Sequence, residues 1–189
     1  MMFRVFGPGR GSLSSHLLRG AELWNKAEAA EIRKNARVAA KCWSRRRTNL
    51  SRVQRRELTK SIAQGLADHY GTAGTLAFTS PTMRATTATI TFHILMTTRL
   101  LDASGQLDER TRELDDVKRG PEEVKWIRAM IENQTNRSLE RAGVESRVDR
   151  RSLIEQRAAA LNGGDVDRAA QLDRPARIHE GPKVTQNSA

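Results

Sequence analysis

Apolar residues recur at helical spacing in three stretches of the chain. The first, Leu17–Ala40, combines helix-forming residues with a rough apolar stripe and predicts a helix. The second begins at Ser51, which Gln54 follows three residues later as in a capping box, so we expect a helix from here to Gly71. The third, Gly120–Gly143, opens with a proline and two glutamates and closes on a glycine, which predicts the clearest helix of the chain.

Two further segments have the composition of β-strands. Gly74–Phe78 is a short candidate, and Ala88–Leu101 is a longer one that is rich in threonine and isoleucine. After the third helix, Ser152–Leu161 is a candidate for another short helix. The local patterns therefore predict a mixture of helices and strands.

The length of 189 residues fits one domain with unstructured ends. Turn-forming residues dominate both ends, so we expect a disordered or unrelated segment over 1–16, a folded domain over 17–161 and a loose tail over 162–189. No apolar run approaches the roughly 20 residues of a membrane span, and no signal-peptide pattern opens the chain, so we expect a soluble, cytoplasmic protein without membrane insertion. The single cysteine, Cys42, leaves no disulfide partner, and we expect an idle thiol.

Positive charge is concentrated in one region. The net charge of +11 and the pI of about 10.9 favour a polyanionic partner such as nucleic acid, because bound cations release its counterions. Between residues 33 and 60 a single acid, Glu57, stands among eleven cations. The same run also fits a solvated basic face or a flexible arm. The candidate DNA-binding residues are Arg33, Lys34, Arg37, Lys41, Arg45, Arg46, Arg47, Arg52, Arg55, Arg56 and Lys60.

Five motif-bearing segments follow one another along the chain. The most specific motifs are Leu-Trp-Asn within Gly20–Glu31 and His-Ile-Leu-Met-Thr-Thr-Arg over His93–Arg99. The other segments are Gln54–Leu58, Asn136–Leu153 and Pro175–Gly181. In this order they resemble the MobA/MobL family of plasmid-mobilisation relaxases, which is part of the HUH endonuclease superfamily.

The resemblance implies an α+β fold, in which helices pack on one side of an antiparallel relaxase-like sheet. It also implies an enzyme that nicks one strand of plasmid DNA at the transfer origin. In such an enzyme a tyrosine attacks the phosphodiester, while a divalent metal, Mg or Mn, held by histidines polarises the phosphate. The implied partner is therefore plasmid DNA.

The chain departs from the family pattern at the residues that carry the chemistry. The family places two metal-binding histidines around a hydrophobic residue and a third upstream, whereas here the triplet is Thr91-Phe92-His93, which leaves His93 as a residual ligand. The family tyrosine lies near the N-terminus, whereas Tyr70, the only tyrosine here, falls on the apolar side of a predicted helix. Arg150 stands where the family has a histidine. We therefore expect no catalytic residue, no cofactor and an incomplete sheet.

The genetic code offers a cause for these departures. Codons chosen for residues 78–91, read in a shifted frame, encode His-Val-Pro-Asp-Asp-Ala-Gly-Asp-Asp-Arg-Asn-Tyr-His, which supplies the two missing family histidines directly before Phe92. Codons for residues 41–44 read in the same shifted frame as Glu-Val-Leu-Val. A relaxase gene that has suffered frameshifts is therefore one hypothesis.

Three functions follow from the sequence. The first is a truncated, degenerate relaxase-family protein associated with DNA mobilisation, a pseudoenzyme without nickase activity. The second is a non-enzymatic basic protein that binds nucleic acid through charge alone. The third is an unselected product of a frameshifted relaxase gene. Steep salt dependence without sequence preference distinguishes the second from the first.

Overall fold

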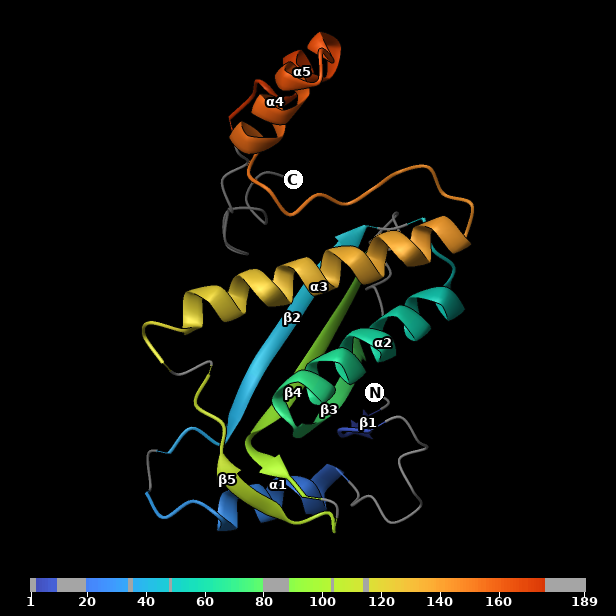
Figure 1. Ribbon diagram of the computed structural model, residues 1–189. Coiled ribbons are helices and arrows are strands. Elements are labelled where there is room, and N and C mark those ends of the chain that lie inside the picture. Colours follow the sequence, from blue (N-terminus) through green and yellow to red (C-terminus); the bar gives the residue numbers. More distant parts are fainter. Residues whose placement is uncertain are drawn as a thin grey trace, which may run out of the picture. The chain divides into compact units, whose positions relative to one another are not determined.

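The computed structural model describes residues 3–9, 20–33, 36–47, 49–79, 89–102, 104–113 and 116–175. The chain divides into two compact units, Met1–Val148 and Asp149–Ala189. The first unit contains a sheet with three helices, and the second contains two short helices (Figure 1). The elements of the first unit are β1 (Phe3–Phe6), α1 (Gly20–Ala29), β2 (Ala39–Arg47), α2 (Arg52–Tyr70), β3 (Thr72–Thr79), β4 (Thr89–Leu101), β5 (Leu107–Arg110) and α3 (Gly120–Arg141).

The strands form one antiparallel sheet in the order β1-β3-β4-β2, and β5 pairs with the end of β4. β4 is the central strand, because it pairs with β3 along one edge and with β2 along the other. Its register places His93 opposite Ala77 of β3 and opposite Trp43 of β2. This antiparallel sheet with its helices confirms the expected α+β class.

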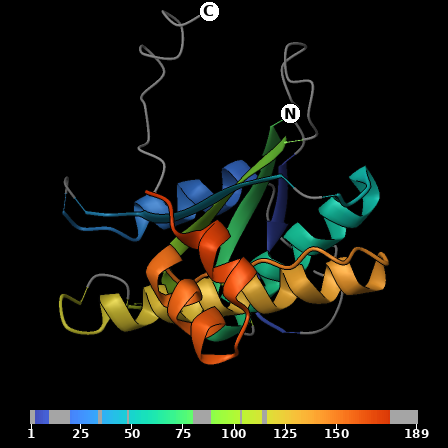
Figure 2. The ribbon, with the colours of Figure 1, turned by 90° about the horizontal axis from the view of Figure 1, so that it is seen from above.

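The two faces of the sheet carry different helices. Alternate residues of a strand point to opposite faces, so Leu76, Ile94 and Met96 share one face, where they join the core beneath α2 and α3. Thr75 lies on the other face, where its hydroxyl accepts a hydrogen bond from the indole of Trp24 in α1 at 3.3 Å. Figure 2 shows α1 on one side of the sheet and α2 with α3 on the other. α2 and α3 thus pack on one side as expected, and the short α1 adds to the opposite side.

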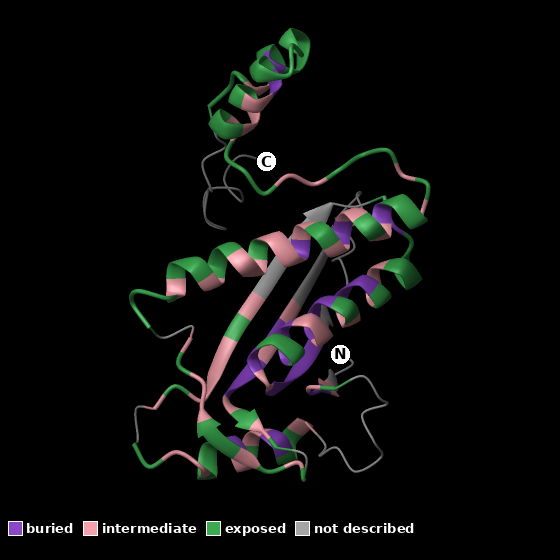
Figure 3. Ribbon diagram, viewed as in Figure 1, coloured by how far each residue is buried: buried purple, intermediate pink, exposed green. Residues whose placement is uncertain are grey.

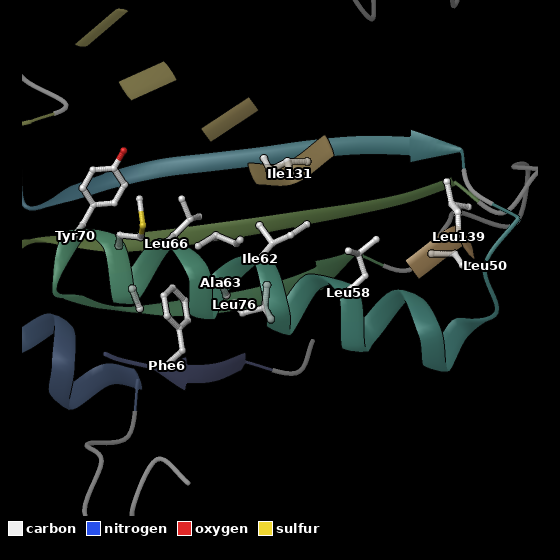
Figure 4. Packing of buried hydrophobic residues seen from close by; sticks show 13 residues of the cluster. Phe6, Leu50, Leu58, Ile62, Ala63, Leu66, Tyr70, Leu76, Ile131 and Leu139 are labelled. Carbon is white, nitrogen blue, oxygen red and sulfur yellow. The ribbon is translucent and has the colours of Figure 1, made fainter. Parts of the chain in front are cut away.

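The sequence signals that predicted α2 are present in the structure. The hydroxyl of Ser51 accepts from the backbone N–H of Gln54, and the amide oxygen of Gln54 accepts from the backbone N–H of Ser51. Gly71 ends the helix in the left-handed conformation, with φ 63°. Ile62 and Leu66 point from α2 into the core (Figure 4). The prediction of this helix is confirmed.

α3 covers the core beside α2. It begins with Gly120-Pro121 and ends at Arg141, as expected, and Gly143 follows it with φ 67°. Its buried residues, Ile131, Thr135 and Leu139, lie one turn apart on the side that faces the core. Figure 3 shows α3 with buried, half-buried and exposed segments in alternation along its length.

The predicted helix over Leu17–Ala40 is wrong in its second half. α1 ends at Ala29, and residues 39–47 form β2 instead. Val38 continues the helical spacing of Trp24 and Ala27, but nine residues of β2 pair with β4, and this tertiary pairing overrides the local preference. Residues 10–19, which include the expected start of this helix, lie outside the described part.

Two short strands were not expected. β1 lies within the N-terminal segment predicted to be disordered or unrelated, and it pairs with residues 74–77 of β3. β5 pairs with β4 at Arg99 and Leu101. A strand of four residues has too few side chains for a recognisable alternation, so its pairing is decided by the neighbouring strand. The predicted β3 and β4 are confirmed, with β4 beginning at Thr89.

The second unit is a pair of helices. α4 (Leu153–Asn162) begins with a capping box between Ser152 and Glu155 and confirms the predicted short helix. α5 (Val166–Leu172) follows it, with the carboxylate of Asp165 accepting from the backbone N–H of Arg168. α5 thus lies within the segment 162–189 that was expected to be a loose tail. Within the described residues, no helix is long and apolar enough to cross a membrane.

Candidate functional site

His93 lies in the middle of the central strand, on the face opposite to α2 and α3. Its neighbours in the strand, Ile94 and Leu95, alternate between the core and the other face, and Ile94 is buried in the core. His93 itself is half-buried. On the adjacent strand, Lys41 pairs with Leu95, so it occupies the position diagonal to His93 on the same face. Lys41 is exposed.

The described neighbours of His93 do not favour a divalent metal. In the pairing register His93 lies opposite Ala77, and its diagonal neighbour Lys41 is a cation that repels a metal ion. Within the described ranges, no group of three or more histidines, cysteines, aspartates or glutamates is placed to hold a metal ion. The side chains of Thr91 and Phe92 and residues 80–88 lie outside the described part. The residual metal role of His93 therefore stays a prediction.

Tyr70 ends α2 and belongs to the core on the other side of the sheet. Its hydroxyl donates to the carboxylate of Glu123 at 3.0 Å, and the same carboxylate oxygen lies 3.2 Å from Nε2 of His69. Trp126 stacks on His69 with ring centroids 3.6 Å apart. Burial, helped by the bond to Glu123, raises the pKa of Tyr70 far above its usual value. The expectation that Tyr70 is a core residue is confirmed.

The described cations of the basic run are divided between the two sides of the sheet. Arg33 and Arg37 are exposed in the loop before β2, and Lys41 is exposed on that strand. β2 extends over nine residues, or roughly 25 Å, before it reaches Arg47, of which only the backbone is described. The remaining cations follow on α2, which covers the other face of the sheet. There Arg52 is exposed, Arg55, Arg56 and Lys60 are half-buried, and Lys60 pairs with Glu57. Lys34 lies outside the described residues.

A buried ionic network was not foreseen in the sequence. The carboxylate of Glu31, whose side chain is 7% exposed, lies 3.0 Å from Nε of Arg99 and 3.7 Å from Nε of Arg110. Arg99 also donates to the backbone carbonyls of Ala30 at 2.8 Å and Asp108 at 2.9 Å. Its partners are up to 69 residues away in sequence, so no local pattern reveals them. The last residue of the His93–Arg99 motif thus connects α1 to β4 and β5.

Two other features were considered as sites. Burial raises the pKa of the Cys42 thiol, which agrees with the expected idle cysteine and not with a nucleophile. A groove of about 640 Å³ runs between α2 and α3. One wall carries Arg137 and Arg141 and the other carries Glu57 and Asp68, so opposite charges face each other across it.

Comparison with known proteins places this geometry in context. The sequence profile described as the MobA/MobL family matches residues 12–186. A solved structure described as "Molecular Basis of Vancomycin Resistance Transfer in Staphylococcus aureus" shares the fold, with a TM-score of 0.61 and 23% sequence identity. The similarity covers 80% of this chain and 76% of that chain. No curated protein matches the sequence.

Proposed function

Since this chain belongs to the MobA/MobL family, we propose that it is a relaxase-like mobilisation protein that binds DNA but does not nick it. The DNA is plasmid DNA near a transfer origin, and it lies against the face of the sheet that carries His93. The family match is the observation that carries this proposal. The surroundings of His93 and Tyr70 support the absence of strand cleavage.

Cleavage needs a nucleophile and a metal on the same side of the sheet. Tyr70 is the only tyrosine of the sequence, it is 5% exposed, and its hydroxyl is engaged by Glu123. It lies beneath α2, whereas His93 lies on the opposite face, so its oxygen has no access to a phosphate bound at His93. The raised pKa of Tyr70 also disfavours the phenolate that would attack phosphorus.

DNA binding is supported by the distribution of cations around the face of His93. Lys41 is exposed beside His93, and Arg33 and Arg37 are exposed in the loop that leads into β2. A DNA strand across this face would exchange its counterions for these side chains. No membrane or disulfide partner is part of the proposal.

Exposed cations such as Arg52 on the far side of the sheet favour a second candidate, a basic protein that binds nucleic acid through charge alone. Selection of binding sequences from a pool of hairpin-forming single strands distinguishes the two. Enrichment of one hairpin that persists as salt is raised supports the mobilisation protein. Unselective binding that disappears steeply with salt supports the alternative.

A further inference from the structure

The loop between α1 and β2 is attached to the sheet at both of its ends. At its first end, Arg99 binds the carbonyl of Ala30 and the carboxylate of Glu31. At its second end, the carbonyl of Arg37 accepts from Nη2 of Arg110 at 2.7 Å and from the hydroxyl of Thr98 at 2.9 Å. The two ends are therefore held by side chains from β4 and β5, and the loop projects from a fixed base.

The ion pair between Glu31 and Arg99 at this base is largely shielded from solvent. The side chain of Glu31 is 7% exposed and that of Arg99 is 20% exposed. Removal of one partner from such a pair leaves an uncompensated buried charge, which is strongly unfavourable. Three charge-assisted bonds of Arg99 also fix its planar guanidinium in one orientation. The described part of the loop is consequently preorganised.

Beyond this base the loop presents an apolar and a cationic side chain next to each other. Ile32 is 99% exposed, and Arg33 beside it is exposed. The backbone N–H of Ala36 donates to the carbonyl of Arg33 at 3.0 Å. A single exposed isoleucine is ordinary on a protein surface. Here, however, it lies next to a cation on a loop that the half-buried Arg99 and Arg110 hold at its ends.

We propose that Ile32 and Arg33 are a contact for a single DNA strand, and that Arg99 is the positioning residue that holds this part of the chain through Glu31. Ile32 packs against a base, and Arg33 binds the adjacent phosphate. A preorganised loop loses little conformational entropy on binding, which favours this arrangement. Nucleic acid offers apolar base faces and phosphates in alternation, which matches the two side chains.

The loop is also connected to β4, the strand that carries His93. Ala39, the first residue of β2, pairs with Thr97, which is four residues from His93 along β4. The loop is attached at Thr98 and Arg99, five and six residues from His93 along β4, so its base is about 17–20 Å from His93. A strand that passes His93 would meet the loop within a few nucleotides. The inference thus rests on the proposed function and names the part of the chain that holds the DNA.

The proposal is tested by fluorescence anisotropy. The two labelled ligands are a single-stranded oligothymidine and an abasic strand of the same length. In a KCl series Arg33→Ala should reduce the salt slope of the logarithm of the affinity by about 0.7 on both strands, the value of one lost phosphate contact. Ile32→Ala should weaken binding to oligothymidine about fivefold, as estimated from partial loss of apolar burial, without changing the slope. It should leave binding to the abasic strand unchanged. Arg128→Ala, an exposed arginine on α3, is the matched control and should change neither quantity.

A double-mutant cycle between Arg99 and Arg33 tests the positioning role of Arg99. Arg99→Lys keeps the charge but not the three bonds, so it should reduce the salt slope as Arg33→Ala does, and adding Arg33→Ala to it should have no further effect. A merely structural role would lower the fraction of folded protein and leave the slope of the folded part unchanged. If Arg99→Lys does not fold, the two surface variants still decide the question. If Arg33→Ala and Ile32→Ala both bind DNA with the affinity and salt slope of the wild-type protein, the loop contact is overturned and the proposed function is not. If the wild-type protein binds neither strand, the proposed function is overturned together with the loop contact.

Discussion

Gly74→Ala is expected to destabilise the protein by displacing β1. Gly74 lies in β3 next to an irregularity in its pairing with β4, and it pairs with Phe6 of β1. A Cβ atom at this position would lie 2.2 Å from the backbone carbonyl oxygen of Leu95 and 2.5 Å from Cζ of Phe6. Because the carbonyl oxygen belongs to the central strand, the methyl group can be accommodated only by movement of the backbone or by loss of the Phe6 packing.

The size of the loss in stability is estimated from these two contacts. Overpacking of a closely packed site costs about 1–3 kcal/mol, and partial exposure of the Phe6 side chain adds about 1 kcal/mol. We therefore expect the free energy of unfolding to fall by about 2–4 kcal/mol, which lowers the melting temperature by roughly 5–15 °C for a chain of this size. Urea unfolding followed by circular dichroism measures the change.

Gly20→Ala is the matched control. A Cβ atom at Gly20, the first residue of α1, would meet only Cγ2 of Thr75 at an ordinary 3.5 Å. This variant should be as stable as the wild-type protein or slightly more stable, because alanine favours the helix. A Gly74→Ala protein within about 0.5 kcal/mol of the wild type would refute the close packing of β1 on β3.

Three further predictions concern the core, a helix end and the metal site. Because burial raises the pKa of Tyr70 above that of the unfolded chain, the contribution of Tyr70 to stability is complete below about pH 10 and is lost as the pH rises further. In urea unfolding, Tyr70→Phe should remove this alkaline loss of stability, and an unchanged dependence of the free energy of unfolding on pH would contradict the prediction. Ser51→Ala should lower the free energy of unfolding by about 1 kcal/mol through loss of the α2 cap, whereas Ser61→Ala, in the same helix, should not; equal values for the two would argue against the cap. Replacing residues 78–91 by the shifted-frame peptide should create Mn²⁺ binding that calorimetry detects and that His93→Ala weakens; a folded repaired chain without added Mn²⁺ affinity would remove His93 from the metal site.

The sequence predicted the elements whose signals are local. The capping box at Ser51, the left-handed Gly71 and the proline at the start of α3 are each decided within a few residues, so α2 and α3 begin and end near the expected positions. The long β4 was recognisable because its threonine and isoleucine content favours a strand over thirteen residues. These elements also carry most of the core.

The features that the sequence did not predict depend on contacts between segments that are distant in the chain. The strand over Ala39–Arg47 looked like the end of a helix followed by an irregular basic segment, and only its pairing with β4 makes it a strand. For the same reason the sequence did not show that the two faces of the sheet divide the described cations of the basic run. The network of Glu31, Arg99 and Arg110 has no sequence signal except that Arg99 ends a family-like motif.

We propose that this MobA/MobL chain binds DNA and does not cleave it. To test this, the purified protein is incubated with end-labelled hairpin-forming single strands and Mn²⁺, and one half of each reaction is then run on a native gel and the other on a denaturing gel. We expect a retarded complex on the native gel and only intact, free DNA on the denaturing gel. Shortened DNA, or a protein-linked band that survives denaturation, would contradict it, because either requires a nucleophile and an electrophilic phosphate to meet in this chain.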